Sequence, residues 1–473
     1  MYLSQLLAGV NVIEKYNYTD CEIKGVHYNS AKIQQGDIFV AIRGFVTDGH
    51  KYIPSAAENG ASAVICEEYN PDCPIAQIVV EDSRVAEAIV SANYFGNPAG
   101  KFKLIGITGT NGKTTCSYLV KKVLDTAGYK VGLIGTNQNM IGDTVFETGR
   151  TTPDSFELQE LFSRMAEAGV DYVVMEVSSH ALELSRVYGC RFAVGAFTNL
   201  TQDHLDFHKT MEAYADAKAK LFNVSDVAVI NCDDLCGADF VARFGAKGYG
   251  IDTDCAYRAE NTEFSASGVA FNIGEQRYVL NIPGRFSVYN ALCAIGICAE
   301  CGIEPKLIAH ALADAEGVKG RAEVVPVDGD YTVMIDYAHT PDGIENILKT
   351  VRGFAKGRVV ILFGCGGDRD NTKRPIMGKV AGELADFCIV TSDNPRTEDP
   401  ASIIAMIEPA VKASGTPYVV IENRADAIAY ALDNAQPDDV IVLAGKGHET
   451  YQVLGTETIH FDEREIVKAH FDK

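Results

Sequence analysis

An apolar strand, a glycine-rich turn and an amphipathic helix follow one another over residues 104–128. The segment reads LIGIT, then GTNGKTT, then CSYLVKKVLDTAG. Glycines let such a turn direct its backbone N–H groups inward, where they can cradle phosphate oxygens at the positive end of the helix. A plain tight turn would explain the glycines but not the Gly-Lys-Thr-Thr order directly after a strand. The segment therefore predicts a phosphate-binding loop within an α/β fold.

The side chains of this loop have distinct expected tasks. Lys113 can reach the outer phosphates of a nucleotide, and the Thr114 hydroxyl can bind Mg²⁺. Ile107 stands where the general phosphate-loop pattern has its first glycine, so this is the shorter TGTNGKTT form. We expect ATP contacts from Gly109, Thr110, Asn111, Gly112, Lys113, Thr114 and Thr115.

Strand-like and helical segments alternate along most of the chain, which is typical of a mostly parallel α/β sheet. A length of 473 residues corresponds to about three domains at ~150 residues each. The segment GNPAGKFK at 96–103 can serve as a first linker. We predict a small mixed α/β domain over residues 1–100, a central ATP-binding α/β domain over 101–322, and a Rossmann-like α/β domain over 323–473.

Four strand candidates of the last third run directly into polar loops. These loops read DYAHTPD, GCGGDRD, DNPRTEDP and GKGHE. In open α/β sheets, ligands bind at the carboxyl ends of the strands. The four loops therefore predict a second binding surface, separate from the phosphate loop.

The charge balance limits the partners of this chain. It has 42 Lys and Arg against 64 Asp and Glu, a net charge of −22, so bulk charge will not attract nucleic acid or an anionic membrane. No apolar run approaches the ~18–20 residues of a membrane span. The first residues, MYLSQLLAGVNVIEKY, predict an amphipathic helix and no signal peptide. We expect a cytoplasmic monomer whose 13 cysteines are reduced.

Seven sequence blocks together resemble the Mur ligase family, the ATP-dependent amide-forming enzymes of peptidoglycan precursor synthesis. In family order they are GTNGKTT, MEVSSHAL at 175–182, NLTQDHLDFH at 199–208, YADAKAKLF at 214–222, GRFSVYNALCA at 284–294, GRAEVV at 320–325 and DYAHTPD at 336–342. The chain is most similar to members that add the third amino acid to UDP-N-acetylmuramoyl-L-alanyl-D-glutamate. The resemblance implies that ATP phosphorylates the γ-carboxylate of D-glutamate and that an amine then attacks the acyl phosphate.

The resemblance also implies a site for two Mg²⁺ ions. Glu176, at the end of YVVME, and His204, in TQDHLDFH, would bind metal together with Thr114. By residue type alone, Glu176 could equally be a solvated acid and His204 a satisfied loop histidine. Lys218 resembles the carbamylated lysine of the family, an N6-carboxylysine that binds metal as an anion, although two solvated lysines would explain its helix. With Lys113, these residues form the expected catalytic set.

Further contacts to the nucleotide and the acceptor are implied in the same way. Asn290 matches the residue that contacts adenine, Asp336 is a ribose hydroxyl acceptor, and Arg321 can approach the terminal phosphate. Residues 28–50 resemble the uridine-binding segment of the family, which implies that the domain over 1–100 binds the UDP-sugar. That segment usually begins D-S-R; here Ser30 is kept, while Asn29 and Ala31 replace the Asp and the Arg. Leu184 stands where some relatives have a Gln. The UDP-sugar dipeptide is expected to contact Ser30, Thr47, Thr151, Thr152, Ser178 and Arg186.

The motif DNPR at 393–396 distinguishes between possible incoming amino acids. An Asx-Pro turn would be a sufficient structural explanation. However, the motif is similar to that of members that take meso-2,6-diaminopimelate, whereas lysine-adding members lack the arginine. We therefore expect meso-diaminopimelate rather than L-lysine. The expected contacts are Arg369 and Arg396 to the second carboxylate, Asp393, Asn394 and Glu449 to ammonium groups, and Pro395 and Gly445 beside them.

Two other functions are consistent with parts of the sequence. A folylpolyglutamate-type ligase would share the phosphate loop and the core, but the N-terminal domain and DNPR argue against it. A non-catalytic sensor of nucleotide-sugars would need the loop alone. The set of Lys113, Glu176, His204 and Lys218 argues against a sensor, because a sensor has no need for two metals.

Overall fold

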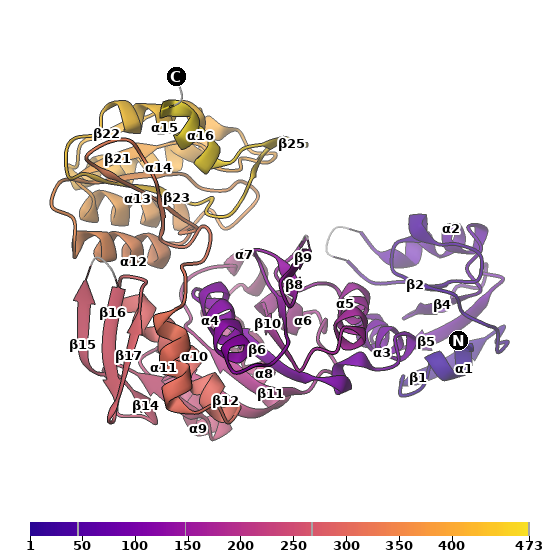
Figure 1. Ribbon diagram of the computed structural model, residues 1–473. Coiled ribbons are helices and arrows are strands. Elements are labelled where there is room, and N and C mark those ends of the chain that lie inside the picture. Colours follow the sequence, from indigo (N-terminus) through magenta and orange to yellow (C-terminus); the bar gives the residue numbers. More distant parts are fainter. Residues whose placement is uncertain (45–46, 147, 266–267, 472–473) are drawn as a thin grey trace. The chain divides into compact units, whose positions relative to one another are not determined.

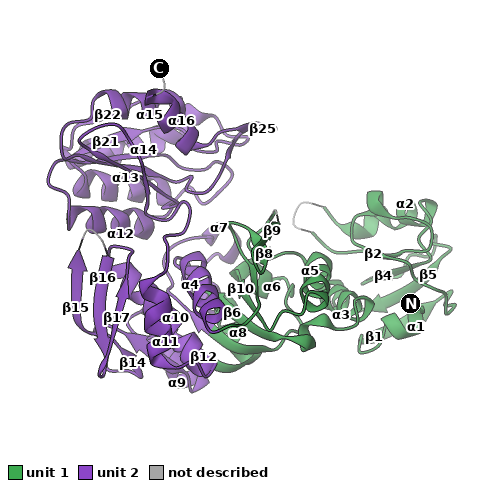
Figure 2. Ribbon diagram, in the orientation of Figure 1, with its two compact units in different colours: residues 1–108, 128–195, 217–227 green, residues 109–127, 196–216, 228–473 purple. Residues whose placement is uncertain are grey.

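The computed structural model describes residues 1–44, 47–146, 148–265 and 268–471 (Figure 1). They form two compact units, shown in different colours in Figure 2. Unit 1 comprises residues 1–108, 128–195 and 217–227, and unit 2 comprises residues 109–127, 196–216 and 228–473. Within the described residues, no helix combines the length and the apolar character needed to cross a membrane.

Unit 1 begins with a five-stranded sheet. Its order is β1 (Val12–Tyr16), β5 (Ala76–Val80), β4 (Ala63–Cys66), β3 (Ile38–Val40) and β2 (Val26–His27), and β1 alone among these runs antiparallel. Strands β3, β4 and β5 lie within the apolar runs GDIFVAI, SAVICEE and IAQIVVE. The helical elements here are α1 (Leu3–Leu6), η1 (Ser30–Lys32), η2 (Gly49–Tyr52), α2 (Ile53–Glu58), α3 (Ser83–Tyr94) and η3 (Pro98–Lys101).

The prediction of one amphipathic helix at the N-terminus is wrong beyond its first turn. Helix α1 ends at Leu6, and Gly9 then adopts φ +80°. Residues 12–16 form β1, which pairs antiparallel with β5. The apolar spacing of Leu3, Leu6 and Leu7 does serve the core, where all three are buried. The glycine and the β-branched pair that follows it favour a turn and a strand over a second helical turn.

The second sheet of unit 1 has the order β12-β11-β6-β10-β7-β8-β9. Strands β6, β10 and β7 are parallel and almost wholly buried, as expected for the apolar runs LIGIT and YVVME. The antiparallel hairpin β8–β9 was not predicted from the sequence. The elements are β6 (Lys103–Thr108), β7 (Val131–Ile134), β8 (Asn139–Ile141), β9 (Thr144–Phe146), α5 (Ser155–Glu167), β10 (Tyr172–Glu176) and α6 (Ser179–Glu183).

Three elements have residues in both units: β11 (Phe192–Phe197), α8 (Met211–Asn223) and β12 (Ser225–Asn231). Unit 2 contains the strand order β14-β13-β12-β11 and a separate antiparallel sheet, β15-β16-β17, which the sequence analysis missed. Its other elements in this part are α4 (Lys113–Thr126), α7 (Leu205–His208), α9 (Gly237–Phe244), β13 (Lys247–Gly250), β14 (Tyr257–Arg258), β15 (Glu260–Ser265), β16 (Gly268–Ile273), β17 (Gln276–Leu280), α10 (Arg285–Glu300) and α11 (Pro305–Ala313).

The last part of unit 2 is a six-stranded sheet with the order β18-β19-β23-β20-β21-β22. All but β18 run parallel, so the predicted edge of polar loops exists after β19, β20, β21 and β23. The strands are β18 (Glu323–Val325), β19 (Thr332–Asp336), β20 (Val359–Phe363), β21 (Phe387–Val390), β22 (Tyr418–Val420) and β23 (Val440–Ala444).

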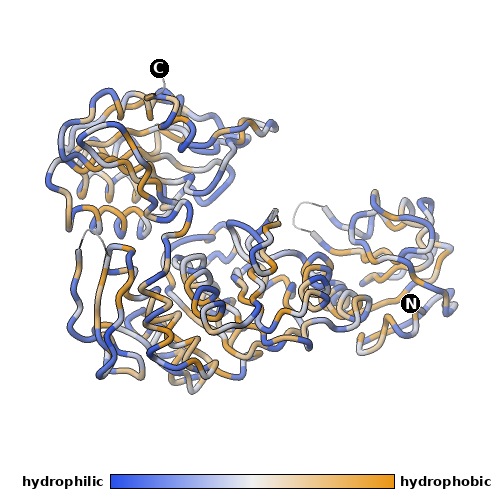
Figure 3. The backbone as a smooth tube through the Cα atoms, viewed as in Figure 1, coloured by the Kyte–Doolittle hydropathy of each residue, from blue (hydrophilic) through white to orange (hydrophobic). Residues whose placement is uncertain are grey.

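Helices cover both faces of this sheet. One face packs against α12 (Pro341–Arg352), α13 (Lys373–Leu384) and α14 (Pro400–Ser414), and the other against α15 (Arg424–Asp433) and α16 (Glu463–Phe471). Hydrophobic residues accordingly concentrate in the strands (Figure 3). A hairpin of β24 (Tyr451–Leu454) and β25 (Glu457–His460) follows the loop after β23. This doubly wound arrangement confirms the Rossmann-like prediction for the region.

A buried ion pair on the α15–α16 side gives a stability prediction. Arg424 and Glu463 are both fully buried, with Nη2 and Oε1 2.8 Å apart. Arg424→Met leaves a buried carboxylate without its cation, so we expect the free energy of unfolding to fall by about 3–5 kcal/mol. The readout is the midpoint of the first urea transition.

The exposed pair Lys349–Glu345 on α12 provides the control. Lys349→Met should leave the midpoint nearly unchanged, and adding Glu463→Met to Arg424→Met should recover much of the loss. Equal losses from the buried and the exposed substitution would contradict this assignment.

Candidate nucleotide and substrate sites

The phosphate loop is fixed by a second segment, residues 198–201, also in unit 2. Thr110 N–H donates to Asn199 O at 2.8 Å, and Asn111 N–H donates to the Asn199 side-chain oxygen at 2.9 Å. Thr198 Oγ1 donates in turn to Asn111 O at 2.6 Å. Hydrogen bonds within the protein therefore support the shape of the loop.

The loop ends at Gly112, which has φ +85° and is the N-cap of α4. A side chain there would meet Asn290 Oδ1 at 2.5 Å, so the close approach of these two residues requires glycine. The Lys113 ammonium donates to Gly109 O and Thr110 O, both at 2.8 Å. Positive charge thus lies over the backbone of the loop.

A cavity of about 340 Å³ opens beside the loop, entirely within unit 2. Six predicted ATP-binding residues line it: Asn111, Gly112, Thr115, Asn290, Arg321 and Asp336. A larger hollow of about 690 Å³ shares Arg321 but includes no phosphate-loop residue. We therefore take the smaller cavity as the nucleotide pocket.

Asp233 contributes a fixed negative charge to the wall of this pocket. Its carboxylate accepts the backbone N–H groups of residues 251–253 at 2.6–2.9 Å and the Tyr289 hydroxyl at 2.9 Å. Burial would raise the pKa of Asp233, but these hydrogen bonds outweigh it and lower the pKa to about 2. The sequence analysis missed Asp233 because nothing in its local pattern distinguishes it from a turn aspartate.

Asp336 and Arg321 meet at the other side of the pocket. Asp336 accepts the N–H groups of Ala322, at 2.6 Å, and Ala338, at 2.8 Å. Burial raises its pKa despite the neighbouring Arg321 charge. Arg321 Nη2 donates to Thr114 Oγ1 at 3.2 Å, and its guanidinium lies 4.6 Å from the centre of the Tyr337 ring. These contacts bring Arg321 to the phosphate loop, while its approach to the terminal phosphate and the ribose role of Asp336 stay predictions.

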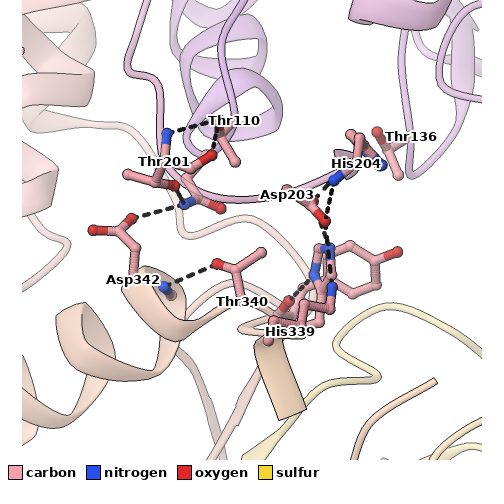
Figure 4. A network of polar contacts seen from close by, with 12 residues as sticks. Thr110, Thr136, Thr201, Asp203, His204, His339, Thr340 and Asp342 are labelled. Carbon is pink, nitrogen blue, oxygen red and sulfur yellow. Dashed lines mark hydrogen bonds and ion pairs between the residues drawn. The ribbon is translucent and has the colours of Figure 1, made fainter. Parts of the chain in front are cut away.

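A polar network joins the loop region to residues that follow β19 and β20 (Figure 4). Asp203 Oδ1 accepts from Lys373 Nζ at 3.3 Å, while Oδ2 lies 3.8 Å from His339 Nε2. Burial would raise the pKa of Asp203, but the nearby His339 ring and the Lys373 charge hold it well below its usual value. Asn111 Nδ2 donates to Asp342 Oδ2 at 2.7 Å. The blocks TQDH and DYAHTPD contain Asp203 and His339, yet the sequence analysis gave neither a role.

A threonine-rich cluster surrounds Glu176 in unit 1. The Glu176 carboxylate accepts the N–H and the hydroxyl of Thr136, both at 2.9 Å, and Thr136 Oγ1 lies 3.0 Å from Thr151 Oγ1. Thr152 Oγ1 donates to Glu176 O at 2.8 Å and accepts Ser178 N–H at 3.0 Å. Four residues that the sequence predicts for the site therefore lie together, namely Thr151, Thr152, Glu176 and Ser178. Thr136 also belongs to this cluster, and the sequence analysis missed it.

Arg186 extends this cluster toward the N-terminal sheet within unit 1. Its Nη1 donates to Thr152 O at 3.0 Å, and its Nε lies 2.7 Å from Asp154 Oδ1. Burial lowers the pKa of Arg186 to about 10. Arg150 also pairs with Asp154, and Tyr28 OH donates to Asp154 Oδ2 at 3.2 Å. An anion bound here would meet two guanidinium groups.

The two predicted uridine-side residues, Ser30 and Thr47, belong to different segments of the N-terminal part of unit 1. Ser30 begins η1, where its carbonyl accepts Asn59 Nδ2 at 3.0 Å. Thr47 lies just before η2, with its hydroxyl 3.4 Å from Tyr52 OH. Tyr28, two residues before Ser30, is the contact through which this segment reaches Asp154. Their roles in binding stay predictions.

The loops after β20, β21 and β23 bring the predicted amino-acid contacts together in unit 2. Asn394 Nδ2 donates to Glu449 Oε2 at 2.8 Å, and a side chain at Gly445 would lie 2.5 Å from Asp393 Oδ2. Arg396 Nη1 donates to Gly367 O at 2.9 Å. The side chains of Arg396 and Arg369 both lie within 4 Å of the position of a side chain at Gly366, and Pro395 packs against Gly367. The acidic side chains of Asp393 and Glu449 and the basic side chains of Arg369 and Arg396 thus lie in loops at the same edge of the sheet.

The predicted metal ligands have donor atoms suited to Mg²⁺. No three His, Cys, Asp or Glu side chains among the described residues gather closely enough to hold a metal by themselves. Thr114 and Glu176 are buried oxygen donors, which fit a hard cation. Lys218 is 1% exposed, a position where carbamylation would replace a buried cation by oxygen ligands. The Mg²⁺ set, including His204, stays a prediction.

A phosphate loop that opens a helix after a parallel strand, with a polar pocket beside it, defines a nucleotide-binding α/β protein. Three family models match this chain: "Mur ligase family, catalytic domain" over residues 22–97, "Mur ligase middle domain" over 107–298 and "Mur ligase, glutamate ligase domain" over 320–447. The chain belongs to the Mur ligase family.

Individual relatives agree with this membership. The chain is 51% identical to a UDP-N-acetylmuramoyl-L-alanyl-D-glutamate--2,6-diaminopimelate ligase of Clostridium botulinum, over 94% of this chain and 95% of that protein. A solved structure of a ligase with the same name is 32% identical, with a TM-score of 0.66 over 95% of each chain. The MurF ligase of Thermotoga maritima in complex with ADP has a TM-score of 0.61 at 18% identity, over 95% of this chain and 97% of that one, which bears on the fold alone.

The close approach of Gly112 and Asn290 gives a binding prediction. Gly112→Ala would place a methyl group 2.5 Å from Asn290 Oδ1 and distort the loop, so we expect the ATP dissociation constant to rise at least about tenfold. Isothermal titration with ATP and Mg²⁺ measures it.

Gly128→Ala is the matched control for backbone strain. Gly128 has φ +89°, close to that of Gly112, but a side chain there meets nothing within 4 Å. ATP binding should survive this substitution. Equal weakening by both would mean that strain, and not the loop geometry, decides the affinity.

Proposed function

We propose that this chain is an ATP-dependent ligase that adds meso-2,6-diaminopimelate to the γ-carboxylate of D-glutamate in UDP-N-acetylmuramoyl-L-alanyl-D-glutamate. The products would be the UDP-N-acetylmuramoyl-tripeptide, ADP and phosphate. The observation that carries the proposal is the gathering of acidic and basic side chains around DNPR, in a chain that is 51% identical to a ligase of this name. The reaction serves peptidoglycan synthesis and hence cell-wall biogenesis, cell shape and cell division.

The chemistry proceeds through an activated carboxylate. The γ-carboxylate oxygen attacks the γ-phosphorus of ATP, and ADP leaves. The diaminopimelate amine then attacks the carbonyl carbon, loses a proton, and expels phosphate from the tetrahedral intermediate. ADP leaves in the first step and phosphate leaves in the second. No atom changes its oxidation state, so no redox partner is needed.

The nucleotide part of this proposal rests on the pocket in unit 2. The loop N–H groups and Lys113 would bind the phosphates. Asn290 would contact adenine and Asp336 would contact the ribose. Arg321 lies close to the phosphate loop, where it donates to the Thr114 hydroxyl. The remaining loop residues would complete the phosphate cradle. Catalysis gains most from such preorganised positive charge at the transferring phosphoryl group.

The metal part of the proposal involves four residues. Thr114, Glu176, His204 and carbamylated Lys218 would hold two Mg²⁺ ions, which when bound neutralise phosphate charge. Thr136 would orient Glu176, since both carboxylate oxygens accept from it.

The acceptor would bind along unit 1. Ser30 and Thr47 would contact the uridine end, and Thr151, Thr152, Ser178 and Arg186 the muramoyl dipeptide. The pairing of Arg186 and Arg150 with Asp154 supports an anion site at the peptide end. We further propose that domains over residues 1–100, 101–322 and 323–473 perform these tasks and that the enzyme works as a cytoplasmic monomer without nucleic-acid partners.

The test is phosphate release with UDP-N-acetylmuramoyl-L-alanyl-D-glutamate, ATP and Mg²⁺, with mass spectrometry of the product. Turnover with meso-diaminopimelate but not L-lysine is the expected result. Preference for L-lysine would keep the ligase and overturn the amino-acid assignment. Release with neither would overturn the proposal and bring back a folylpolyglutamate-type activity or a nucleotide-sugar sensor as alternatives.

Arg396 provides a sharper test of amino-acid recognition. Arg396→Met removes the proposed cation for the second carboxylate, so the KM for meso-diaminopimelate should rise about 10- to 100-fold, the effect of losing a hydrogen bond to a charged group. The KM for ATP should stay nearly constant in steady-state assays.

Arg352→Met is the control, because Arg352 is a half-exposed arginine on α12 that pairs with Asp386. Its kinetics should match those of the unmodified enzyme. Parallel losses for both substrates in Arg396→Met would refute the role of Arg396.

A further inference from the structure

Lys446 is a fully buried lysine in the loop that follows β23. Its side chain has 0% exposure, and its ammonium lies 3.0 Å from Glu449 Oε2 and 3.2 Å from Asn394 Oδ1. The rings of Tyr451 and Phe461 lie 5.6 and 5.7 Å from the ammonium. A buried lysine is costly unless anions and acceptors surround it, as they do here.

The lysine shares its surroundings with two carboxylates of the proposed amino-acid pocket. Asp393 and Glu449 are both buried. Burial would raise the pKa of Asp393, but the charges of Lys446 and Arg424 hold it below its usual value. Arg424 is already paired with Glu463 at 2.8 Å. Lys446 is therefore the cation that balances this acidic pair.

Lys446 also fixes the orientation of Asn394. Asn394 Oδ1 accepts from the ammonium and from Val453 N–H at 3.0 Å, so its Nδ2 is turned to Glu449 Oε2 at 2.8 Å. Glu449 Oε2 thus has two donors, Lys446 and Asn394. Removal of the ammonium would take one hydrogen bond from Asn394 Oδ1 and one from Glu449 Oε2.

We propose that Lys446 is a positioning residue that sets the charge of the pocket and thereby favours a zwitterionic amino-acid end over a bare ammonium. With Lys446 present, the group of Asp393, Glu449 and Lys446 carries a net charge of −1, which matches one ligand ammonium, while Arg396 would meet the ligand carboxylate. Without Lys446, the group carries −2 and favours a ligand with excess positive charge. The inference rests on the proposed function, since it assumes that this pocket takes the incoming amino acid.

The test compares meso-diaminopimelate with L-lysine as acceptor amines. In Lys446→Met, the ratio of kcat/KM for meso-diaminopimelate to that for L-lysine should fall at least about tenfold, the effect of one unit charge at short range in a partly polar interior. The KM for ATP should stay nearly constant. Lys446→Arg, which keeps the charge, should retain most of the preference.

Two further variants separate specificity from folding. Arg358→Met breaks another ion pair, with the buried Asp439, at the opposite end of the same strands, and should leave the ratio unchanged even if stability falls. Lys446→Gln keeps a hydrogen-bond donor but no charge, so it decides the question by the same ratio if Lys446→Met does not fold.

The outcomes distinguish the two proposals. Wild-type enzyme that turns over neither amino acid overturns the proposed function and this inference with it. Wild-type turnover together with an unchanged ratio in Lys446→Met and Lys446→Gln overturns the inference alone. A fall of the ratio in both variants, with the ratio kept in Lys446→Arg, supports it.

Discussion

The nucleotide pocket depends on the hydrogen bonds that hold the phosphate loop to residues 198–201. Asn199 and Thr198 hold the loop through the N–H groups of Thr110 and Asn111 and through the Asn111 carbonyl. The expected phosphate donors are therefore the N–H groups of the later loop residues, at the start of α4. The same strand-to-loop segment continues to Asp203, which binds Lys373 and lies near His339. Within unit 2, the segment that shapes the phosphate loop is therefore also connected to the C-terminal sheet that carries the DNPR and GKGHE loops.

Charge balance is the second constraint, because an acidic chain must bind anionic substrates through local cations. Arg321 and Lys113 lie at the phosphate loop, Arg150 and Arg186 share Asp154, and Arg396 donates to Gly367 O in the C-terminal loops. Each cation is held by a carbonyl, hydroxyl or carboxylate oxygen. Such partners reduce the reorganisation that ligand binding requires.

The sequence was sufficient for the parts that depend on local pattern. Apolar runs such as 358–363 and 439–444 predict strands, and Gly112 with Lys113 predicts the loop, because periodicity and glycine geometry act over a few residues. The N-terminal residues 12–16 and the sheet β15-β16-β17 were missed, since their pairing partners decide their conformation. A short strand without a partner has no reliable local signature.

The same reason explains which site residues were missed. Thr136, Asp154, Asp233 and Lys446 each depend on a partner that is distant in the sequence, in this order Glu176, Arg186, Tyr289 and Asn394. Motif resemblance supplied Glu176, Arg186 and Asn394 but not the residues that hold them. Burial and long-range hydrogen bonds reveal those supporting residues, and the printed sequence records neither.

The central claim is that this chain forms an amide bond by first phosphorylating the acceptor carboxylate. Its most direct test uses UDP-N-acetylmuramoyl-L-alanyl-D-glutamate with ¹⁸O in the γ-carboxylate and follows the released phosphate by ³¹P NMR. An acyl phosphate transfers one carboxylate oxygen to phosphate, so each amide bond formed should yield one ¹⁸O-labelled phosphate. Unlabelled phosphate accompanying amide formation would contradict the account.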